Sequence, residues 1–165
     1  MSSLQTQLSK DTMIGRAMRP DSNNGPVAER VSPPGPTALI VDDDDVSALA
    51  LSALLERGGL STLAASSGPA ALETLDARTD VGVVLMDIMM PVMDGYEAMA
   101  EIRKRPAYLN IPIIAVTGKD RDGERERCIA AGASDYVAKP IDTPGLLSAL
   151  SGWLPAFGPM QGLRA

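Results

Sequence analysis

Histidine is absent from this 165-residue chain, and cysteine occurs once, at Cys128. Without an imidazole, the chain cannot carry a Ser-His-Asp or Cys-His catalytic centre, a histidine metal site or a phosphohistidine. A single thiol excludes an internal disulfide and agrees with the reducing environment of the cytoplasm. Any chemistry on this chain must therefore use carboxylates, hydroxyls, lysine or backbone groups.

The sequence has no apolar run near the ~20 residues of a membrane span. Its N-terminus also lacks the basic segment followed by an apolar one that marks a secretory signal. We therefore expect a cytoplasmic protein without a membrane segment. The net charge is −6, and residues 1–36 carry four basic and three acidic side chains, which leaves 11 basic and 18 acidic side chains for residues 37–165. That acidic balance argues against a nucleic-acid surface, which would be basic.

The chain divides by composition into a tail, a patterned region and a short end. Residues 1–36 contain breaker clusters at 21–26 and 30–36 and are predicted to be a disordered or weakly ordered tail or linker. Residues 155–165 are predicted to be a C-terminal tail. Between them, residues 37–154 alternate between apolar strand runs and helical spacings, which predicts strands at 38–41, 60–65, 81–86, 111–116 and 135–138 and helices at 44–58, 69–78, 96–104, 120–131 and 143–154.

Five βα units in this length predict the α/β class, with a parallel sheet covered by helices on both faces. Continuous apolar strands support that arrangement. The expected architecture is a flavodoxin-like doubly wound five-stranded sheet of order 2-1-3-4-5. Apolar residues at helical spacing mark the first and last helices, and the last one is expected to bury Leu146, Leu147, Leu150, Trp153 and Leu154.

Reactive side chains follow four of the five strands. Asp42 and Asp43 follow the first strand, Asp87 the third, Thr117 the fourth and Lys139 the fifth. The second strand, which ends at residues 65–66 (AS), has nothing ionisable, and in the expected order it is an edge strand. The carboxyl ends of the other four strands meet at one crevice, so these side chains are expected to converge there.

Three carboxylates in one crevice repel each other, by roughly 4 kcal/mol per pair of unit charges at ~4 Å and an effective dielectric of 20. Either some of them are protonated or a cation lies among them. A small all-oxygen site with room for water suits Mg²⁺. Together with a lysine and a hydroxyl, such a cation would hold a tetrahedral oxyanion such as a phosphoryl group.

Each of these residues also has a simpler interpretation. Asp44 and Asp45 suit the start of a helix, where acids are favoured, but this does not explain charge at positions 42 and 43. Taken singly, Asp87 could open a turn and Lys139 could be an exposed residue before Pro140. Their joint occurrence at successive strand ends is what favours a functional site.

Four segments carry a resemblance to a known family. Residues 39–44 (LIVDDD) form an acidic opening, residues 85–98 (LMDIMMPVMDGYEA) surround Asp87, and residues 111–118 (IPIIAVTG) and 131–140 (AGASDYVAKP) end the series. Together they resemble the receiver domains of two-component response regulators, and in detail those attached to hybrid sensor kinases. The resemblance runs from about residue 37 to residue 154.

The resemblance implies a phosphoryl-accepting site. Asp87 would be phosphorylated by the phosphohistidine of a partner, either a histidine kinase or a histidine phosphotransfer protein. Asp42 and Asp43 would hold Mg²⁺ together with Asp87 and the backbone carbonyl of Met89. The domain would catalyse its own phosphorylation and slow dephosphorylation without being a classical enzyme.

The resemblance also implies a switch. Thr117 would donate its hydroxyl to a phosphoryl oxygen, and Lys139 would pair with the phosphoryl group, before a bond to Pro140 that is usually cis. Tyr136 would swing inward as Thr117 moves. The surface formed by the fourth helix, the fifth strand and the fifth helix would then signal to an unknown protein target, and no output domain is expected after Leu154.

Two residues depart from the common receiver pattern. Met89 is apolar where many receivers carry a polar side chain that positions water, so we expect slow self-dephosphorylation. Lys119, two residues after Thr117, adds a second positive charge near the site.

Two other functions are compatible with parts of the sequence. Asp42 and Asp44, with Val46, resemble the nucleophile motif of haloacid-dehalogenase-type phosphatases, where Asp42 would attack and Asp44 would be the general acid. A non-phosphorylated structural module on the same fold is the other alternative. Whether the chain acts alone or belongs to a longer hybrid kinase is left open by the sequence.

Overall fold

The computed structural model describes residues 35–119 and 121–154. The chain separates into two units, Met1–Ser32 and Pro33–Ala165, and all described residues belong to the second. Nearly all of the predicted tail at 1–36, and the predicted tail at 155–165, lie outside the described residues. None of the helices in the described ranges is long and apolar enough to cross a membrane.

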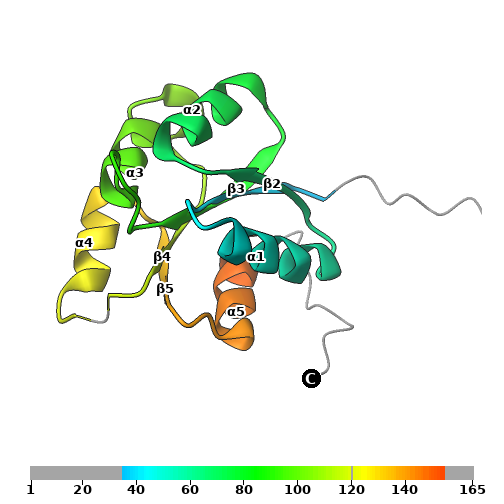
Figure 1. Cartoon of the computed structure of the whole chain (residues 1–165). Coiled ribbons are helices and arrows are strands. Elements are labelled where there is room, and N and C mark those ends of the chain that lie inside the picture. Colours follow the sequence, from blue (N-terminus) through cyan, green and yellow to red (C-terminus); the bar gives the residue numbers. More distant parts are fainter. Residues whose placement is uncertain (1–34, 120, 155–165) are drawn as a thin grey trace, which may run out of the picture. The chain divides into compact units, whose positions relative to one another are not determined.

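Within the described ranges, five strands form one parallel sheet (Figure 1). The strands are β1 (Thr37–Val41), β2 (Ser61–Ala65), β3 (Val81–Asp87), β4 (Ile113–Thr117) and β5 (Asp135–Ala138). Their order is β2-β1-β3-β4-β5, which confirms the predicted flavodoxin-like topology. Strand β2, which has no ionisable residue at its end, is an edge strand, as expected. Strands β1, β3, β4 and β5 are neighbours.

Helices cover both faces of this sheet. The helices are α1 (Asp45–Arg57), α2 (Gly68–Ala77), α3 (Gly95–Arg103), α4 (Glu124–Ala131) and α5 (Thr143–Trp153), with a 3-10 turn at Pro106–Tyr108 that was not predicted. Figure 1 shows α1 and α5 on one side of the sheet and α2 and α3 on the other. Accordingly, one apolar cluster contains Leu51 of α1 and Leu146 of α5, and a second contains Leu75 of α2 and Met99 of α3.

Side-chain caps explain where four helices begin. Asp44, Ser67, Asp94 and Asp142 each accept a hydrogen bond from a backbone amide in the first turn of α1, α2, α3 and α5 respectively. Such caps contribute about 1 kcal/mol each. Helix α4 differs, since it follows Gly123, which has a φ of 85°, and its first turn accepts no cap from the described side chains. The left-handed glycine explains why α4 begins at Glu124 and not at the predicted residue 120.

One expectation about burial is wrong. Trp153, predicted to be buried by α5, is 43% exposed, and its indole N–H donates to Asp135 at 3.3 Å. On α1, Val46 and Leu49 mark the helical spacing but are 75% and 70% exposed, while Leu51 faces the core. Periodicity identified each helix correctly, but it did not decide which apolar side chains face the sheet.

Candidate functional site

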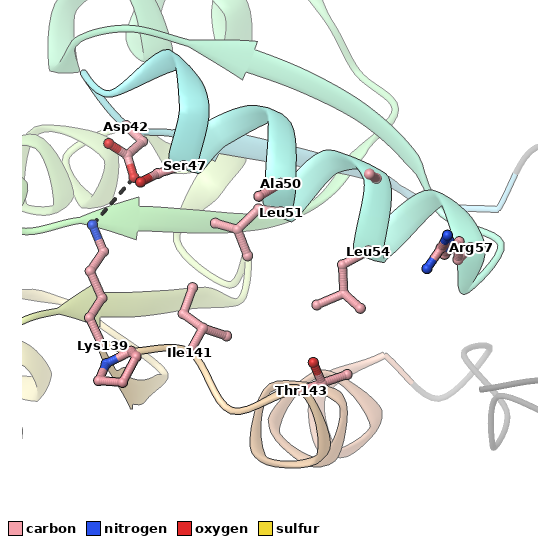
Figure 2. A pocket seen from close by; sticks show the side chains of 11 residues that line it. Asp42, Ser47, Ala50, Leu51, Leu54, Arg57, Lys139, Ile141 and Thr143 are labelled. Atoms are coloured by element: carbon pink, nitrogen blue, oxygen red, sulfur yellow. Dashed lines mark hydrogen bonds and ion pairs between the residues drawn. The ribbon is translucent and has the colours of Figure 1, made fainter. Parts of the chain in front are cut away.

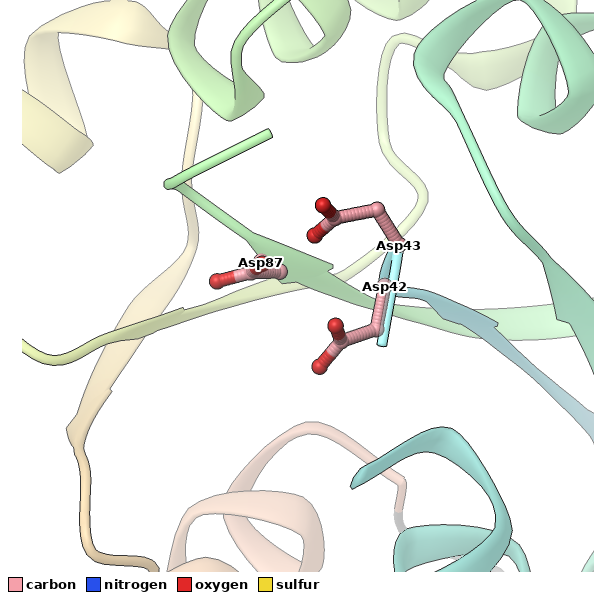
Figure 3. Close-up of side chains that lie close together, drawn as sticks. All are labelled: Asp42, Asp43 and Asp87. Carbon is pink, nitrogen blue, oxygen red and sulfur yellow. The ribbon is translucent and has the colours of Figure 1, made fainter. Parts of the chain in front are cut away.

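Three carboxylates gather at the carboxyl end of the sheet (Figure 3). Asp42 directly follows β1, and Asp87 is the last residue of the neighbouring strand β3. One oxygen each from Asp42, Asp43 and Asp87 lies within 4.8 Å of the others. Asp42 and Asp87 are 3% and 4% exposed, whereas Asp43 is exposed to solvent. The strand ends therefore bring together the three predicted acids.

Lys139 reaches the same acids from the end of β5. Its Nζ lies 3.3 Å from Oδ1 of Asp87 and 3.4 Å from Oδ2 of Asp42. Its backbone amide donates to the carbonyl of Thr117 at 2.7 Å, and the bond to Pro140 is cis, as the resemblance implied. The predicted convergence of Asp87 and Lys139 on one crevice is thus what the structure contains.

The charges of the site are unbalanced. Burial raises the pKa of Asp87 and nearby Asp42 raises it further, against the opposing effect of Lys139. Burial lowers the pKa of Lys139, but Asp87 and Asp42 outweigh this, so the lysine pKa is raised and the amine is charged. The single positive charge of Lys139 does not balance three carboxylates, so a further cation would be favoured at this site. The donor set, carboxylate oxygens with one of them exposed to water, suits Mg²⁺.

Thr117 is fully buried beside this cluster, at the end of β4. Its Oγ1 accepts a hydrogen bond from the backbone amide of Lys119 at 3.0 Å, which leaves its own proton available to another acceptor. Tyr136, which is partly buried on β5, donates its hydroxyl to the carbonyl of Lys119 at 3.4 Å. The loop after β4 therefore contacts both residues that were predicted to form the switch.

The loop after Asp87 is held close to the site by a glycine. The Met89 amide lies 3.4 Å from Oδ1 of Asp87, and the Met89 side chain is 56% exposed. The Gly95 amide donates to the carbonyl of Ile88 at 3.0 Å, and a Cβ at this glycine would lie 2.3 Å from the Asp87 carbonyl oxygen. Gly95 was not singled out from the sequence, although its place after Asp94 at the start of α3 is a recognisable turn signal.

Asp44 has a structural role instead of the chemical one that a phosphatase would need. One of its oxygens caps α1 by accepting from the Val46 amide, and the other accepts from the Ser47 hydroxyl at 2.7 Å. The hydrogen bond from Ser47, followed by that from Val46, lowers the pKa of this carboxyl. A carboxylate held ionised in this way is poorly suited to act as a general acid.

Two cavities open beside the site. One of about 570 Å³ runs along α1 from Asp42 and Lys139, past Leu51 and Leu54, to Arg57 (Figure 2). Its opposite wall is formed by Ile141 and neighbouring residues of the β5–α5 connection. The second, of about 450 Å³, lies between the loops after β3 and β4 and is lined by residues that include Met89, Tyr96 and Lys119.

Comparisons with known proteins agree with this geometry. The family model described as response regulator receiver domain matches residues 38–151. The rice two-component response regulator ORR13 is 33% identical over 116 residues, which are 68% of this chain and 96% of that protein. The Escherichia coli histidine kinase BarA is 36% identical over 122 residues, which are 74% of this chain but 13% of the kinase.

A solved structure gives the same fold together with a bound metal. The receiver domain of the sensor histidine kinase PA1611 from Pseudomonas aeruginosa superposes with a TM-score of 0.67. It is 34% identical, and the match covers 73% of this chain and 98% of that domain. In that protein a magnesium ion is coordinated in the active-site cleft.

Proposed function

This chain belongs to the response regulator receiver domain family, and we propose that it accepts a phosphoryl group on Asp87 from the phosphohistidine of a partner protein. The observation that carries the proposal is the convergence of Asp87, Asp42 and Lys139, whose nitrogen lies 3.3 Å from one acid and 3.4 Å from the other. Since this chain contains no histidine, the phosphoryl group must come from another molecule.

The proposed transfer forms a bond between an Asp87 carboxylate oxygen and phosphorus while the phosphorus–nitrogen bond of the partner breaks. The imidazole nitrogen of the partner keeps the electron pair and takes up a proton. Lys139 balances charge on the phosphoryl oxygens, and Thr117 has a hydroxyl proton to donate to one of them. Asp42, Asp43, Asp87 and the Met89 carbonyl would hold Mg²⁺, which when bound neutralises the developing phosphoryl charge.

The phosphorylated Asp87 gains one or more units of negative charge. Thr117 then has a new acceptor, and its movement pulls on the Lys119 amide and on the Tyr136 hydroxyl that contacts the Lys119 carbonyl. The signal would leave through the surface of α4, β5 and α5, by binding a further protein. Binding of that protein is the proposed output. Residues 37–154 are the proposed domain that produces it, and its proposed location is the cytoplasm.

The 570 Å³ cavity beside α1 is the proposed docking site for the phosphohistidine-bearing partner. One end of the cavity is formed by Asp42 and Lys139, so an occupant of the cavity also reaches the acidic site. Val46 and Leu49, on α1 as well, expose apolar surface that such a partner would cover. A histidine kinase and a histidine phosphotransfer protein are both compatible with this site.

Labelling with acetyl phosphate tests the proposal. In the presence of Mg²⁺, the wild-type protein should become phosphorylated, and Asp87→Asn should abolish labelling while the fold is retained. Retained labelling, mapped to Asp42, would instead favour the haloacid-dehalogenase-type phosphatase. If neither acetyl phosphate nor beryllofluoride changes the NMR spectrum, the chain is a structural module on the receiver fold.

Slow self-dephosphorylation is a separate part of the proposal. The exposed Met89 thioether cannot orient an attacking water as a polar side chain would. Met89→Asn should therefore speed the decay of the phosphorylated protein by about tenfold, which is less than a general base contributes because an amide can orient the water but cannot take its proton. A fast wild-type decay that Met89→Asn does not alter would contradict this part without affecting the assignment of Asp87.

A further inference from the structure

Helix α4 is held against the sheet with little apolar burial. Its buried side chains, within the described residues, are Glu124 and Cys128, and neither is aliphatic. Its first turn follows Gly123, and no described side chain accepts a capping hydrogen bond from the amides of that turn. By contrast, α5 buries Leu146 and Leu150 completely. Polar contacts must therefore contribute more to the position of α4 than to that of α5.

Tyr96, in the first turn of α3, contacts α4 twice. Its hydroxyl donates a short hydrogen bond to Oε1 of Glu124, whose residue is only 3% exposed. The guanidinium of Arg127, one turn further along α4, lies 4.8 Å from the centre of the Tyr96 ring, at the distance of a cation–π contact. Since a buried carboxylate without a donor is costly, Tyr96 determines where the first turn of α4 is stable.

Tyr96 is itself fixed relative to Asp87. It follows Gly95, whose amide donates to the Ile88 carbonyl at 3.0 Å and which lies so close to the Asp87 carbonyl that no Cβ would fit there. Asp94 and Glu97 hold the same turn in a reciprocal capping box. Any movement of α4 relative to Tyr96 is therefore a movement relative to the acidic site.

The other end of the contact is linked to Thr117. Residues 118–123 join β4 to α4, and in this connection the Lys119 amide holds Oγ1 of Thr117 at 3.0 Å. Tyr96 and Lys119 also line the same 450 Å³ cavity, so the start of α3 and the loop before α4 face each other there. A displacement of Thr117 would act on Glu124 through this short connection.

We infer that Tyr96 is a positioning residue, whose hydroxyl holds Glu124, and with it α4 and the loop that follows Thr117, in the arrangement of the unphosphorylated protein. The inference rests on the proposed function. When Thr117 turns to a phosphoryl group on Asp87, the loop moves against the Tyr96–Glu124 hydrogen bond. That bond therefore sets how readily the unphosphorylated domain reaches its switched state.

Tyr96→Phe tests the inference, because it removes the hydroxyl and keeps the ring for Arg127. In the unliganded protein, hydrogen exchange of the backbone amides at 127–131 should become about tenfold faster, as expected for a lost hydrogen bond to a charged group. Beryllofluoride with Mg²⁺, which mimics the phosphoryl group, should bind about fivefold tighter, because less of its binding energy is spent on moving α4.

Two further variants separate positioning from a general loss of stability. Glu124→Gln keeps an acceptor for the Tyr96 hydroxyl and should change both readouts much less than Tyr96→Phe. Tyr108→Phe is the matched control, since that hydroxyl also donates a short hydrogen bond, to the carbonyl of Leu75, at the end of α2. It should leave beryllofluoride affinity unchanged and should not accelerate exchange in α4 selectively.

The inference is overturned if both tyrosine variants accelerate exchange in α4 equally, or if Tyr96→Phe leaves beryllofluoride affinity unchanged or weaker. Failure of the proposed function is distinguishable, since the wild-type protein itself would then show no binding of beryllofluoride. In that case the exchange of the unliganded protein still decides whether Tyr96 holds α4.

Discussion

Helices α5 and α4 both flank β5, yet different interactions hold them in place. Helix α5 begins at an Asp142 cap and buries Leu146 and Leu150. Helix α4 follows a left-handed glycine and is tied to α3 through the buried Glu124. Apolar burial is insensitive to small changes in direction, whereas a single hydrogen bond is directional and is lost after a small displacement.

This difference matches the residues that each helix accompanies. The connection before α5 carries Lys139, and the proposed phosphoryl transfer requires its distances to two acids to be maintained. The connection before α4 follows Thr117 and carries Lys119, and both residues would move in the proposed switch. In the proposed function, the part of the site that would hold the phosphoryl group is therefore anchored by the apolar core, and the part that would respond to it is held by a breakable polar contact.

Truncation of one buried side chain in each helix should give the largest contrast. Leu150→Ala in α5 should lower the free energy of unfolding by about 3 kcal/mol, because it removes all of a fully buried side chain beyond Cβ and leaves a cavity. Cys128→Ala in α4 should cost about 1 kcal/mol, since it removes one sulfur atom. Urea denaturation of both variants measures the difference. Equal losses would show that α4 is anchored as firmly as α5.

The starts of the two helices offer a second contrast. Asp142→Ala should lower the free energy of unfolding by about 1 kcal/mol, through loss of the hydrogen bond that Asp142 accepts from the Gly145 amide at 2.9 Å. Gly123→Ala should cost about 1 to 2 kcal/mol, because a side chain is strained at a φ of 85°, even though the space around Gly123 is open. Gly123→Asn, which tolerates this conformation better, should recover part of the loss.

Val92, in the loop between Asp87 and α3, should give a smaller effect of the opposite sign. It has a φ of 68° and a fully exposed side chain, so a β-branched residue occupies a left-handed conformation without gaining burial. Val92→Gly should relieve strain and raise the free energy of unfolding by about 0.5 kcal/mol, after the entropic cost of glycine is included. A large destabilisation would show that Val92 contributes contacts that compensate for its strain.

The sequence was sufficient to predict the strand order and the acidic site, because both follow from local patterns. Continuous apolar runs identify parallel strands, and the carboxyl ends of neighbouring parallel strands must lie together. The sequence alone therefore predicts that Asp42, Asp87 and Lys139 lie in one crevice. Asp44 could likewise be assigned to a helix cap from its position alone.

The features that were not predicted depend on packing between distant segments. The exposed faces of Val46 and Trp153 are determined by which neighbour covers each helix, and helical spacing does not contain that information. Tyr96 and Glu124 are 28 residues apart, and no local sequence motif predicts that they are in contact. The one available sign was an acid at the start of a strongly charged helix that nevertheless had to pack on a sheet.

Cys128 gives the test with the smallest expected effect. It is the fully buried side chain of α4, so its thiol reports on how closely this helix packs on the sheet. Burial, reinforced by the nearby charge of Glu124, raises the pKa of this thiol to about 11. At pH 8 the native protein should therefore react with thiol reagents far more slowly than the unfolded protein does.

The same shift predicts how stability changes with pH. Since the folded-state pKa lies above the unfolded value, the protonated thiol contributes its full stability below about pH 8, and the contribution declines as the pH rises from about 9 to 11. Comparison of unfolding curves for wild type and Cys128→Ala over this range isolates the thiol from lysine and tyrosine titrations. The wild type should lose stability more steeply than the variant. If the two slopes coincide and the native thiol reacts rapidly, α4 opens from the sheet without help from Thr117, and the contrast between the two helices is larger than their static contacts indicate.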